Sequence, residues 1–218
     1  MKLSIDAKSI DNLLDGGFES GVITEIYGEA GTGKTNICLQ LTREMALTGR
    51  KVAYIDTEGI SVDRLEQICG DNYEQVVKNL LHYKPLSLEE QGKHINGLKK
   101  IPDLGLVIVD SVNIYTRMGM NSDPQVDRKF FGQIMLLQKH AREMKIPIII
   151  ASQVYSSGSD VQPFSGKTMA HIAKVIIRID KVKSDIIGIG KRKAMIIKHR
   201  SIAEEKEAEF SLSGKGIE

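Results

Sequence analysis

The segment GEAGTGKT, from Gly28 to Thr35, has the residue types and spacing of a loop that binds phosphate groups. Its glycines let the backbone wrap until amide groups face phosphate oxygens, and the helix that follows adds its positive N-terminal end. Lys34 would reach the β- and γ-phosphates, and the Thr35 hydroxyl would contact Mg²⁺. The alternative, a glycine-rich turn with an incidental lysine, is disfavoured because an apolar run precedes the loop and a helical pattern follows it. The predicted nucleotide-binding residues of the loop are Gly28, Glu29, Ala30, Gly31, Thr32, Gly33, Lys34, Thr35 and Asn36.

Polar residues at the ends of three other apolar runs could act on a bound phosphate. Asp110 closes LGLVIVD and would hold Mg²⁺ through its hydration shell, unless it only caps a turn. Asp56 and Glu58 close VAYIDTE, and a carboxylate there could deprotonate a water that attacks the γ-phosphate. Spacing alone does not choose between these two. Gln153 closes IPIIIASQ, where an amide could contact the γ-phosphate or its water, or have no role.

Two further features narrow the class of nucleotide-binding protein. The guanine-specificity pattern Asn-Lys-x-Asp is absent from the sequence, which argues against a GTPase. Small-molecule kinases usually carry an arginine-rich lid and need no water-activating glutamate, whereas the segment after Gln153 has no arginine. The remaining prediction is a protein that binds ATP and Mg²⁺ and activates water at the γ-phosphate.

Short, β-branched apolar runs alternate with amphipathic segments along most of the chain. The runs GVITEIYG, KVAYIDTEG, LGLVIVDS and IPIIIASQ have the composition of strands buried on both faces. Helices are expected at 34–47, at 87–99 after a Ser-x-x-Glu capping box, and at 124–144. Three strand-like segments separated only by turns end the chain. The sequence thus predicts a single α/β domain over 1–218, with a mostly parallel central sheet and an antiparallel C-terminal extension.

The overall composition excludes some classes of protein. The 218 residues include 30 basic and 28 acidic side chains, so the net charge of +2 does not by itself indicate a nucleic-acid partner. The N-terminus lacks the apolar region of a signal peptide, and no stretch reaches the roughly 18 apolar residues that a membrane span needs. We therefore expect a cytoplasmic protein without membrane contact.

Basic residues are concentrated in the C-terminal third, where nine Lys or Arg face two Asp between residues 174 and 200. A basic face of this kind can neutralise DNA phosphates and release counterions. GIGKRKAM has the composition of a hairpin tip that presents Lys191, Arg192 and Lys193 together, and these are candidate DNA contacts. The alternative is that they are solvated edge-strand cations that block sheet-to-sheet pairing, which is the favoured interpretation of the more scattered cations.

A second Gly-Lys-Thr occurs in FSGKT, at residues 164–168. It lacks the glycine five residues before its own Gly166, and a polar run rather than a buried strand precedes it. It is therefore not a second phosphate loop. Lys167 is instead a candidate contact for a DNA phosphate, and Tyr155 could stack on a base of a single strand.

Five segments occur in the order and spacing of a known family: SIDNLLDGGFESGVITEIYGEAGTGKT, VAYIDTEG, LGLVIVDS, IIIASQV and SGKTMAHIAKVIIRI. The chain resembles the RecA-like recombinases over nearly its whole length, most closely their archaeal and eukaryotic branch. The resemblance implies a RecA-type P-loop ATPase core. It also implies that Glu58, not Asp56, is the catalytic base, and that Gln153 is the switch that follows the ATP state.

The same resemblance implies roles for residues that spacing alone does not single out. Arg64 resembles an arginine that stacks on adenine, and His171 matches a histidine that senses the γ-phosphate of a neighbouring protomer. Arg117 and Arg128 match basic positions of the first DNA-binding loop. Residues 155–166 match the second DNA-binding loop.

Two departures from the family modify the expected function. The chain begins almost directly at the core, without the N-terminal helical DNA-binding domain, and HRSIAEE replaces a segment that normally caps the adjacent nucleotide. The resemblance then implies weak, DNA-modulated ATP hydrolysis, binding of single-stranded DNA, and an accessory role in recombination and repair. The partners would be the main recombinase of the cell and other recombination or replication proteins. The alternatives are a regulatory module that binds the main recombinase without hydrolysing ATP, and a hexameric clock- or helicase-type relative.

Overall fold

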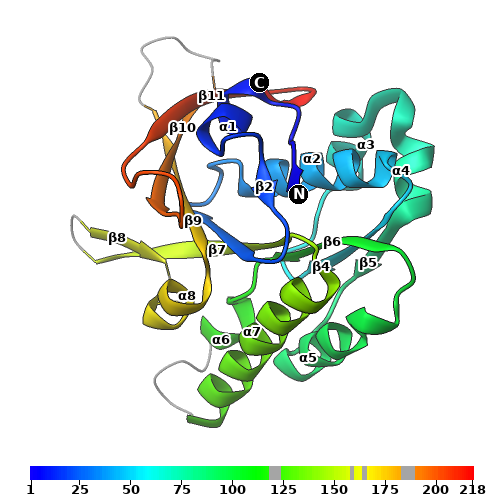
Figure 1. Cartoon of the computed structure of the whole chain (residues 1–218), viewed down its shortest axis with the longest axis vertical. Helices are drawn as coiled ribbons and strands as arrows, with labels where there is room; N and C mark the ends of the chain where they lie inside the picture. Colours follow the sequence, from blue (N-terminus) through cyan, green and yellow to red (C-terminus); the bar gives the residue numbers. More distant parts are fainter. Residues whose placement is uncertain (118–123, 158–159, 164–165, 183–189) are drawn as a thin grey trace.

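The computed structural model describes residues 1–117, 124–157, 160–163, 166–182 and 190–218 (Figure 1). Most strands form one sheet in the order β12-β11-β10-β9-β3-β7-β6-β4-β5, with β8 paired to β7 and a separate β1-β2 ribbon. The six strands from β9 to β5 are parallel, and β10, β11 and β12 continue the sheet in antiparallel fashion. This confirms the predicted sheet. The strands are β1 (Lys2–Leu3), β2 (Phe18–Glu19), β3 (Ile23–Gly28), β4 (Lys51–Asp56), β5 (Leu80–Tyr83), β6 (Leu104–Asp110), β7 (Ile148–Ser157), β8 (Asp160–Pro163), β9 (Val175–Lys181), β10 (Gly190–Lys198), β11 (Glu207–Ser213) and β12 (Gly216–Ile217).

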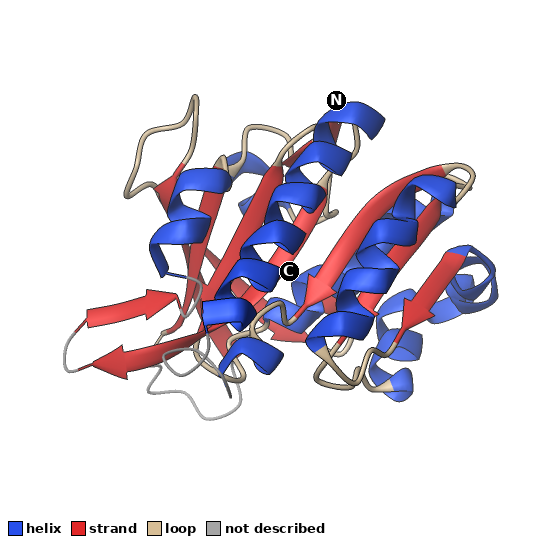
Figure 2. Cartoon of the chain, turned by 90° about the horizontal axis from the view of Figure 1, so that it is seen from below, coloured by secondary structure: helices blue, strands red, loops and turns tan. Residues whose placement is uncertain are grey.

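Helices cover both faces of this sheet (Figures 1 and 2). The helices α1 to α4 pack on one face, and α5, α7 and α8 pack on the other. Because both faces are covered, alternate residues of one strand enter two separate cores: in β6, Ile108 enters the first and Val109 the second. The helices are α1 (Lys8–Leu13), α2 (Lys34–Leu47), α3 (Val62–Cys69), α4 (Tyr73–Asn79), α5 (Leu88–Gly97), α6 (Ile114–Arg117), α7 (Pro124–Met144) and α8 (Gly166–Ile172), with 3₁₀ turns at Gly70–Asn72 and Leu98–Lys100.

The three predicted helices are present as α2, α5 and α7. Ser87 caps α5 as predicted, because its Oγ accepts from Glu90 N at 3.1 Å; the Glu90 side chain reaches one residue further back than in a standard capping box and accepts from Leu86 N at 2.7 Å. Within the described part of the chain, no helix is long and apolar enough to cross a membrane.

The structure corrects two expectations about polar segments. β7 runs past Gln153 to Ser157 and pairs with β8, so much of residues 155–163 is a β-ribbon and not a loop. Lys191, Arg192 and Lys193 lie within β10, not at a hairpin tip. Both segments have their backbone groups paired by a neighbouring strand, which does not require an apolar sequence.

Gln40, buried in α2, joins the two ends of the chain. Its Nε2 donates to the carbonyls of Ile5 (2.9 Å) and Ile217 (3.3 Å), and its Oε1 accepts from Ile217 N at 2.7 Å. Gly216 packs against this side chain, because an added Cβ would lie 2.3 Å from Gln40 Oε1. The C-terminal strands are thereby fixed against the helix that follows the predicted phosphate loop.

We expect Gln40→Leu to lower the free energy of unfolding by about 3 kcal/mol, because it leaves buried backbone groups without partners. Gln75→Leu, at an exposed position of α4, should change it by less than about 0.5 kcal/mol. Urea denaturation of both variants measures the difference in the free energy of unfolding. Equal stability of the two variants would contradict a stabilising role for the Gln40 hydrogen bonds to Ile5 and Ile217.

Candidate functional site

The predicted phosphate loop lies between the carboxyl end of β3 and the start of α2. Gly31 and Gly33 have φ values of +73° and +104°, which side chains other than glycine rarely adopt. Gly28 passes so close to β9 that an added Cβ would lie 2.2 Å from the carbonyl oxygen of Ile179. Glycine is thus required at these three positions for the loop to curve in front of the helix N-terminus.

Lys34 begins α2 and turns back into the loop. Its Nζ donates to the carbonyl oxygens of Gly28 and Glu29, both at 2.8 Å, and the residue is only 7% exposed. Burial lowers the pKa of Lys34, while the nearby carboxylates of Glu58 and Asp110 oppose that shift. The ammonium group is therefore held where the loop backbone converges.

Asp110 lies at the carboxyl end of β6, beside the first turn of α2. Its Oδ2 accepts from the Tyr54 hydroxyl at 2.8 Å, and its carboxylate also accepts from the Thr35 hydroxyl. Burial raises the pKa of Asp110, and these two hydrogen bonds oppose the shift. A hydroxyl and a carboxylate side by side are the oxygen ligands that Mg²⁺ prefers, so Thr35 and Asp110 fit the predicted magnesium site.

Glu58 and Gln153 meet across the carboxyl edge of the sheet. Gln153 Nε2 donates to Glu58 Oε1 at 2.7 Å. Glu58 lies two residues beyond the end of β4, and Gln153 lies within β7, so neither closes its strand as the sequence suggested. One pocket brings the loop and these two side chains together, lined by Ala30, Gly31, Gly33, Lys34, Thr35, Asn36, Glu58 and Gln153.

Asp56, the other candidate for the catalytic base, is buried, and both of its carboxylate oxygens make hydrogen bonds within the protein. Its Oδ1 accepts from the backbone N–H of Glu58 (3.2 Å) and Gly59 (2.7 Å), and its Oδ2 accepts from Ile60 N at 2.8 Å and contacts His82 Nε2 at 2.9 Å. Burial opposes ionisation of Asp56, but these hydrogen bonds outweigh it and hold its pKa below the usual value. Asp56 thus fixes the turn that presents Glu58, and its own oxygens are not directed at the pocket.

Tyr54 and His82 are the residues of this site that sequence reasoning missed. Their rings make an edge-to-face contact, with centroids 6.1 Å apart, and each contacts one of the two strand-end aspartates. Burial raises the pKa of Tyr54 well above its usual value, so its hydroxyl remains a donor to Asp110. Tyr54 lies within the VAYIDTEG segment, where it resembles an ordinary strand residue, and His82 lies in none of the quoted segments. Only the adjacency of β4, β5 and β6 brings these two side chains to the aspartates.

Arg64 in α3 lies beside the loop. Its guanidinium donates to Asn36 Oδ1 at 2.6 Å, to Gln67 Oε1 at 3.0 Å, and to the carbonyls of Ser213 and Gly214 at 2.8 and 3.1 Å. The structure thus places Arg64 next to a predicted nucleotide-binding residue, where it connects α2 to the turn between β11 and β12.

The residues expected to contact DNA are dispersed over several elements. Arg128 is exposed in α7 and His171 is exposed in α8. Arg117 ends α6, Tyr155 lies in β7 and Lys167 in α8, but the side chains of these three lie outside the described part. The DNA assignments therefore rest on sequence and resemblance.

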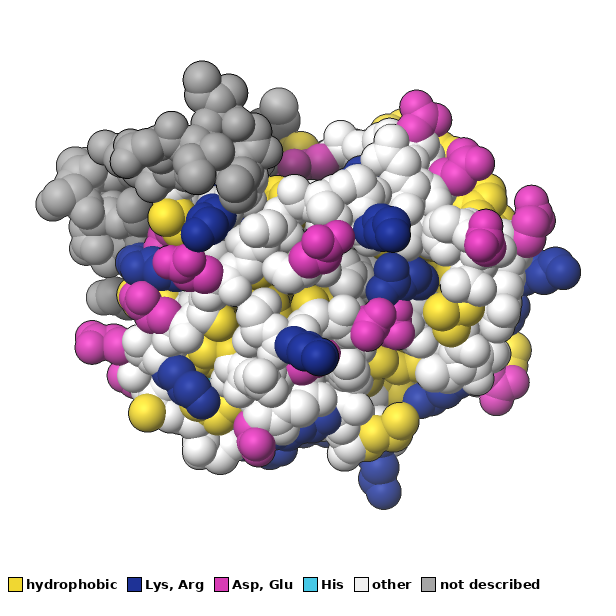
Figure 3. All heavy atoms as spheres, turned by 90° about the horizontal axis from the view of Figure 1, so that it is seen from above, with side chains coloured by type: hydrophobic (Ala, Val, Ile, Leu, Met, Phe, Trp, Pro, Cys, Tyr) yellow, Lys and Arg dark blue, Asp and Glu magenta, His cyan; other side chains and the backbone are white. Residues whose placement is uncertain are grey.

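The three consecutive cations Lys191, Arg192 and Lys193, here called the basic triplet, do not form one patch. Lys191 and Lys193 pair with carboxylates of β11, at 4.0 Å from Glu209 and 2.9 Å from Glu207. The Arg192 guanidinium instead donates to Gly31 O in the phosphate loop at 3.1 Å. Successive side chains of a strand point to opposite faces, which divides the triplet. On the face shown in Figure 3, Lys and Arg are likewise interspersed with Asp and Glu.

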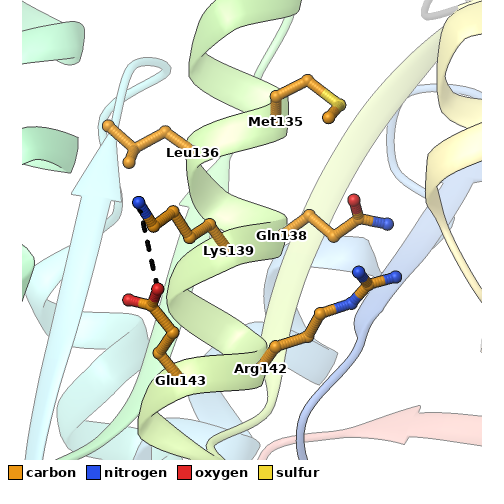
Figure 4. Close-up of a pocket in the computed structure, with 6 residues that line it drawn as sticks. All are labelled: Met135, Leu136, Gln138, Lys139, Arg142 and Glu143. Carbon is orange, nitrogen blue, oxygen red and sulfur yellow. Dashed lines mark ion pairs between the residues drawn. The ribbon is translucent and has the colours of Figure 1, made fainter.

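A second hollow lies on the outer surface of α7 (Figure 4). All its lining side chains come from that one helix, and Lys139 and Glu143 form an ion pair across it at 3.9 Å. It lacks a loop of backbone N–H groups and lies apart from the carboxyl edge of the sheet, so the chemistry belongs to the pocket at the phosphate loop.

Comparisons with known proteins identify the family of this chain. The Rad51 family model matches residues 1–218. A Methanococcoides burtonii protein described as "DNA repair and recombination protein RadB" is 40% identical over 223 residues, covering 99% of this chain and 97% of that protein. The protein of the same description from Archaeoglobus fulgidus is 36% identical, covering 100% and 98%. The "Crystal structure of the RadB recombinase" superposes with a TM-score of 0.84 at 35% identity, covering 99% and 98%.

These matches confirm the resemblance to the RecA-like recombinases. The matches extend over nearly the full length of the relatives, and the sequence comparison and the structure comparison lead to the same group of proteins. The chain belongs to the Rad51 family.

Proposed function

We propose that this protein is an accessory recombinase of homologous recombination and DNA repair that binds ATP with Mg²⁺ and hydrolyses it weakly. The observation that carries the proposal is that Lys34, Thr35, Glu58 and Gln153 line one pocket, with the Asp110 carboxylate hydrogen-bonded to Thr35 beside it. These residues come from one helix, α2, and from three neighbouring strands, β4, β6 and β7, and their types match the steps of phosphoryl transfer to water.

The side chains divide the work as follows. Bound Mg²⁺ would neutralise phosphate charge, held by the Thr35 hydroxyl and, through water, by Asp110. Lys34 would move from the Gly28 and Glu29 carbonyls to phosphate oxygens, which are stronger acceptors for an ammonium donor. Glu58 would orient a water and take its proton.

Gln153 would couple this site to DNA. Its amide contacts Glu58, and the strand that carries it continues directly into the β7-β8 ribbon, which corresponds to the second DNA-binding loop of the family. A γ-phosphate that competes for the Gln153 amide would shift this side chain and the segment after it. We propose that single-stranded DNA binds there, with Arg117, Arg128, Tyr155 and Lys167 as contacts, and that Lys191 and Lys193 add a weaker contribution because carboxylates already pair with them.

The partners would be single-stranded DNA, the main archaeal recombinase RadA, and further recombination or replication proteins. The relatives described as RadB support a role in repair and recombination. His171, exposed on α8, would sense the nucleotide of a neighbouring protomer if copies associate. Membership of the Rad51 family favours this proposal over a clock- or helicase-type ring.

Calorimetric titration of the purified chain with Mg-ATP tests the proposal, together with phosphate release with and without single-stranded DNA. We expect saturable 1:1 binding and slow turnover that DNA changes. A chain that binds no nucleotide would overturn the proposal. A chain that binds ATP without turnover would favour the alternative, a regulatory module that uses ATP as a structural ligand.

A further inference from the structure

Two positively charged side chains lie directly opposite each other on neighbouring strands beside the phosphate loop. Lys181 ends β9 and Arg192 lies near the start of β10, and the antiparallel register pairs these two residues. Like charges directly opposite on neighbouring strands destabilise a sheet. Neither belongs to an ion pair among the described residues, whereas Lys191 and Lys193, the sequence neighbours of Arg192, both do. The repulsion is therefore not relieved by a carboxylate in the described protein.

Both side chains reach the same residue of the loop. Arg192 Nη2 donates to Gly31 O at 3.1 Å, and Lys181 Nζ lies 3.6 Å from the point where a Cβ on Gly31 would be. Gly31 lines the pocket together with Lys34. Arg192 Nε is buried and has no hydrogen-bond partner among the described groups.

Lys34, Lys181 and Arg192 thus place three positive charges around one short loop. The repulsion between Lys181 and Arg192 costs free energy in the protein alone, and a polyanion in the loop relieves it. The relief increases with the charge of the anion, so a triphosphate gains more than a diphosphate. The hydrogen bond from Arg192 to Gly31 O has a second effect, because it holds one peptide of the loop in a fixed orientation.

We propose that the Lys181–Arg192 pair is an additional element of the nucleotide site that strengthens binding of ATP over ADP. Lys181 acts through its charge, and Arg192 acts through its charge and as a positioning residue for the loop. This inference rests on the proposed ATP binding and goes beyond it by naming residues, outside the loop itself, that set the preference for the triphosphate.

The test uses Lys181→Gln, Arg192→Gln and the double variant, with Lys206→Gln, an exposed lysine away from the loop, as the control. Dissociation constants for Mg-ATP and Mg-ADP are measured by calorimetry at two salt concentrations. We expect each single variant to bind ATP about 5-fold more weakly and ADP less than about 2-fold more weakly, with a smaller difference at high salt. Arg192→Lys should retain part of the ATP preference, because it keeps the charge and not the guanidinium geometry.

Thermal unfolding without nucleotide separates this role from a structural one. Removing one of two repelling charges should leave the melting temperature unchanged or raise it, whereas loss of a structural residue lowers it. Unchanged ATP affinity, or equal losses for ATP and ADP with a lowered melting temperature, would overturn the inference and leave the proposed function intact. A wild-type chain that binds neither ATP nor ADP would overturn both this inference and the proposed function.

Discussion

Replacing Glu58 by glutamine is expected to lower Mg-ATP turnover by at least about 100-fold, the usual contribution of a general base. The amide is nearly isosteric with the carboxylate but cannot accept the proton of the attacking water. It can still hydrogen-bond to Gln153, so the pocket keeps its shape, and the dissociation constant for Mg-ATP should change by less than about 3-fold. Asp56 cannot substitute for the missing base, because its carboxylate is committed to three backbone N–H groups and to His82.

The matched control is Glu66→Gln at an exposed position of α3, which should retain the turnover of the unmodified protein. Phosphate release under single-turnover conditions and calorimetry with Mg-ATP separate the chemical step from binding. If Glu58→Gln retains the turnover of a pure preparation, the hydrolysis does not come from this site, and the non-hydrolysing regulatory module becomes the better account.

Replacing Lys34 by alanine should weaken Mg-ATP binding by about 100-fold or more, because a charge-assisted hydrogen bond to phosphate contributes up to about 3 kcal/mol. The free energy of unfolding of the nucleotide-free protein should fall little, since the variant also removes a buried ammonium group that is costly to desolvate. Lys8→Ala, at an exposed position of α1, controls for the loss of one positive charge. Calorimetry measures both variants, and wild-type affinity in Lys34→Ala would show that the nucleotide binds elsewhere.

Much of the geometry of the candidate site could be predicted because its information is local in the sequence. The phosphate loop is continuous, and the apolar run before it and the helical pattern after it fix its place between β3 and α2. Asp110 was predictable for a similar reason, since it ends an apolar strand. Sequence spacing alone did not choose between Glu58 and Asp56 as the base, so that prediction rested on the family resemblance. Only the folded turn shows that the Asp56 carboxylate accepts hydrogen bonds from the backbone of its own neighbours.

The parts that could not be predicted depend on which strands are neighbours. Tyr54 reaches Asp110 because β4 lies beside β6, and His82 reaches Asp56 because β5 lies beside β4. Arg192 illustrates the same limit: three consecutive cations look like one cluster in the sequence, but the two-residue period of a strand sends the middle one to the phosphate loop and the outer two to β11. The β7-β8 ribbon was missed because its residues are polar, and only strand pairing reveals it.

The central claim is that the nucleotide at Glu58 and Gln153 controls the binding of DNA. It is tested most directly by the affinity for a fluorescent single-stranded oligonucleotide, measured by anisotropy with Mg²⁺ and a non-hydrolysable ATP analogue, with ADP, and without nucleotide. We expect binding at least about 5-fold tighter with the analogue than without nucleotide, and loss of that difference in Gln153→Ala, within the usual range for coupling between two sites. Equal affinities for DNA in all three nucleotide states of the unmodified protein would contradict the account.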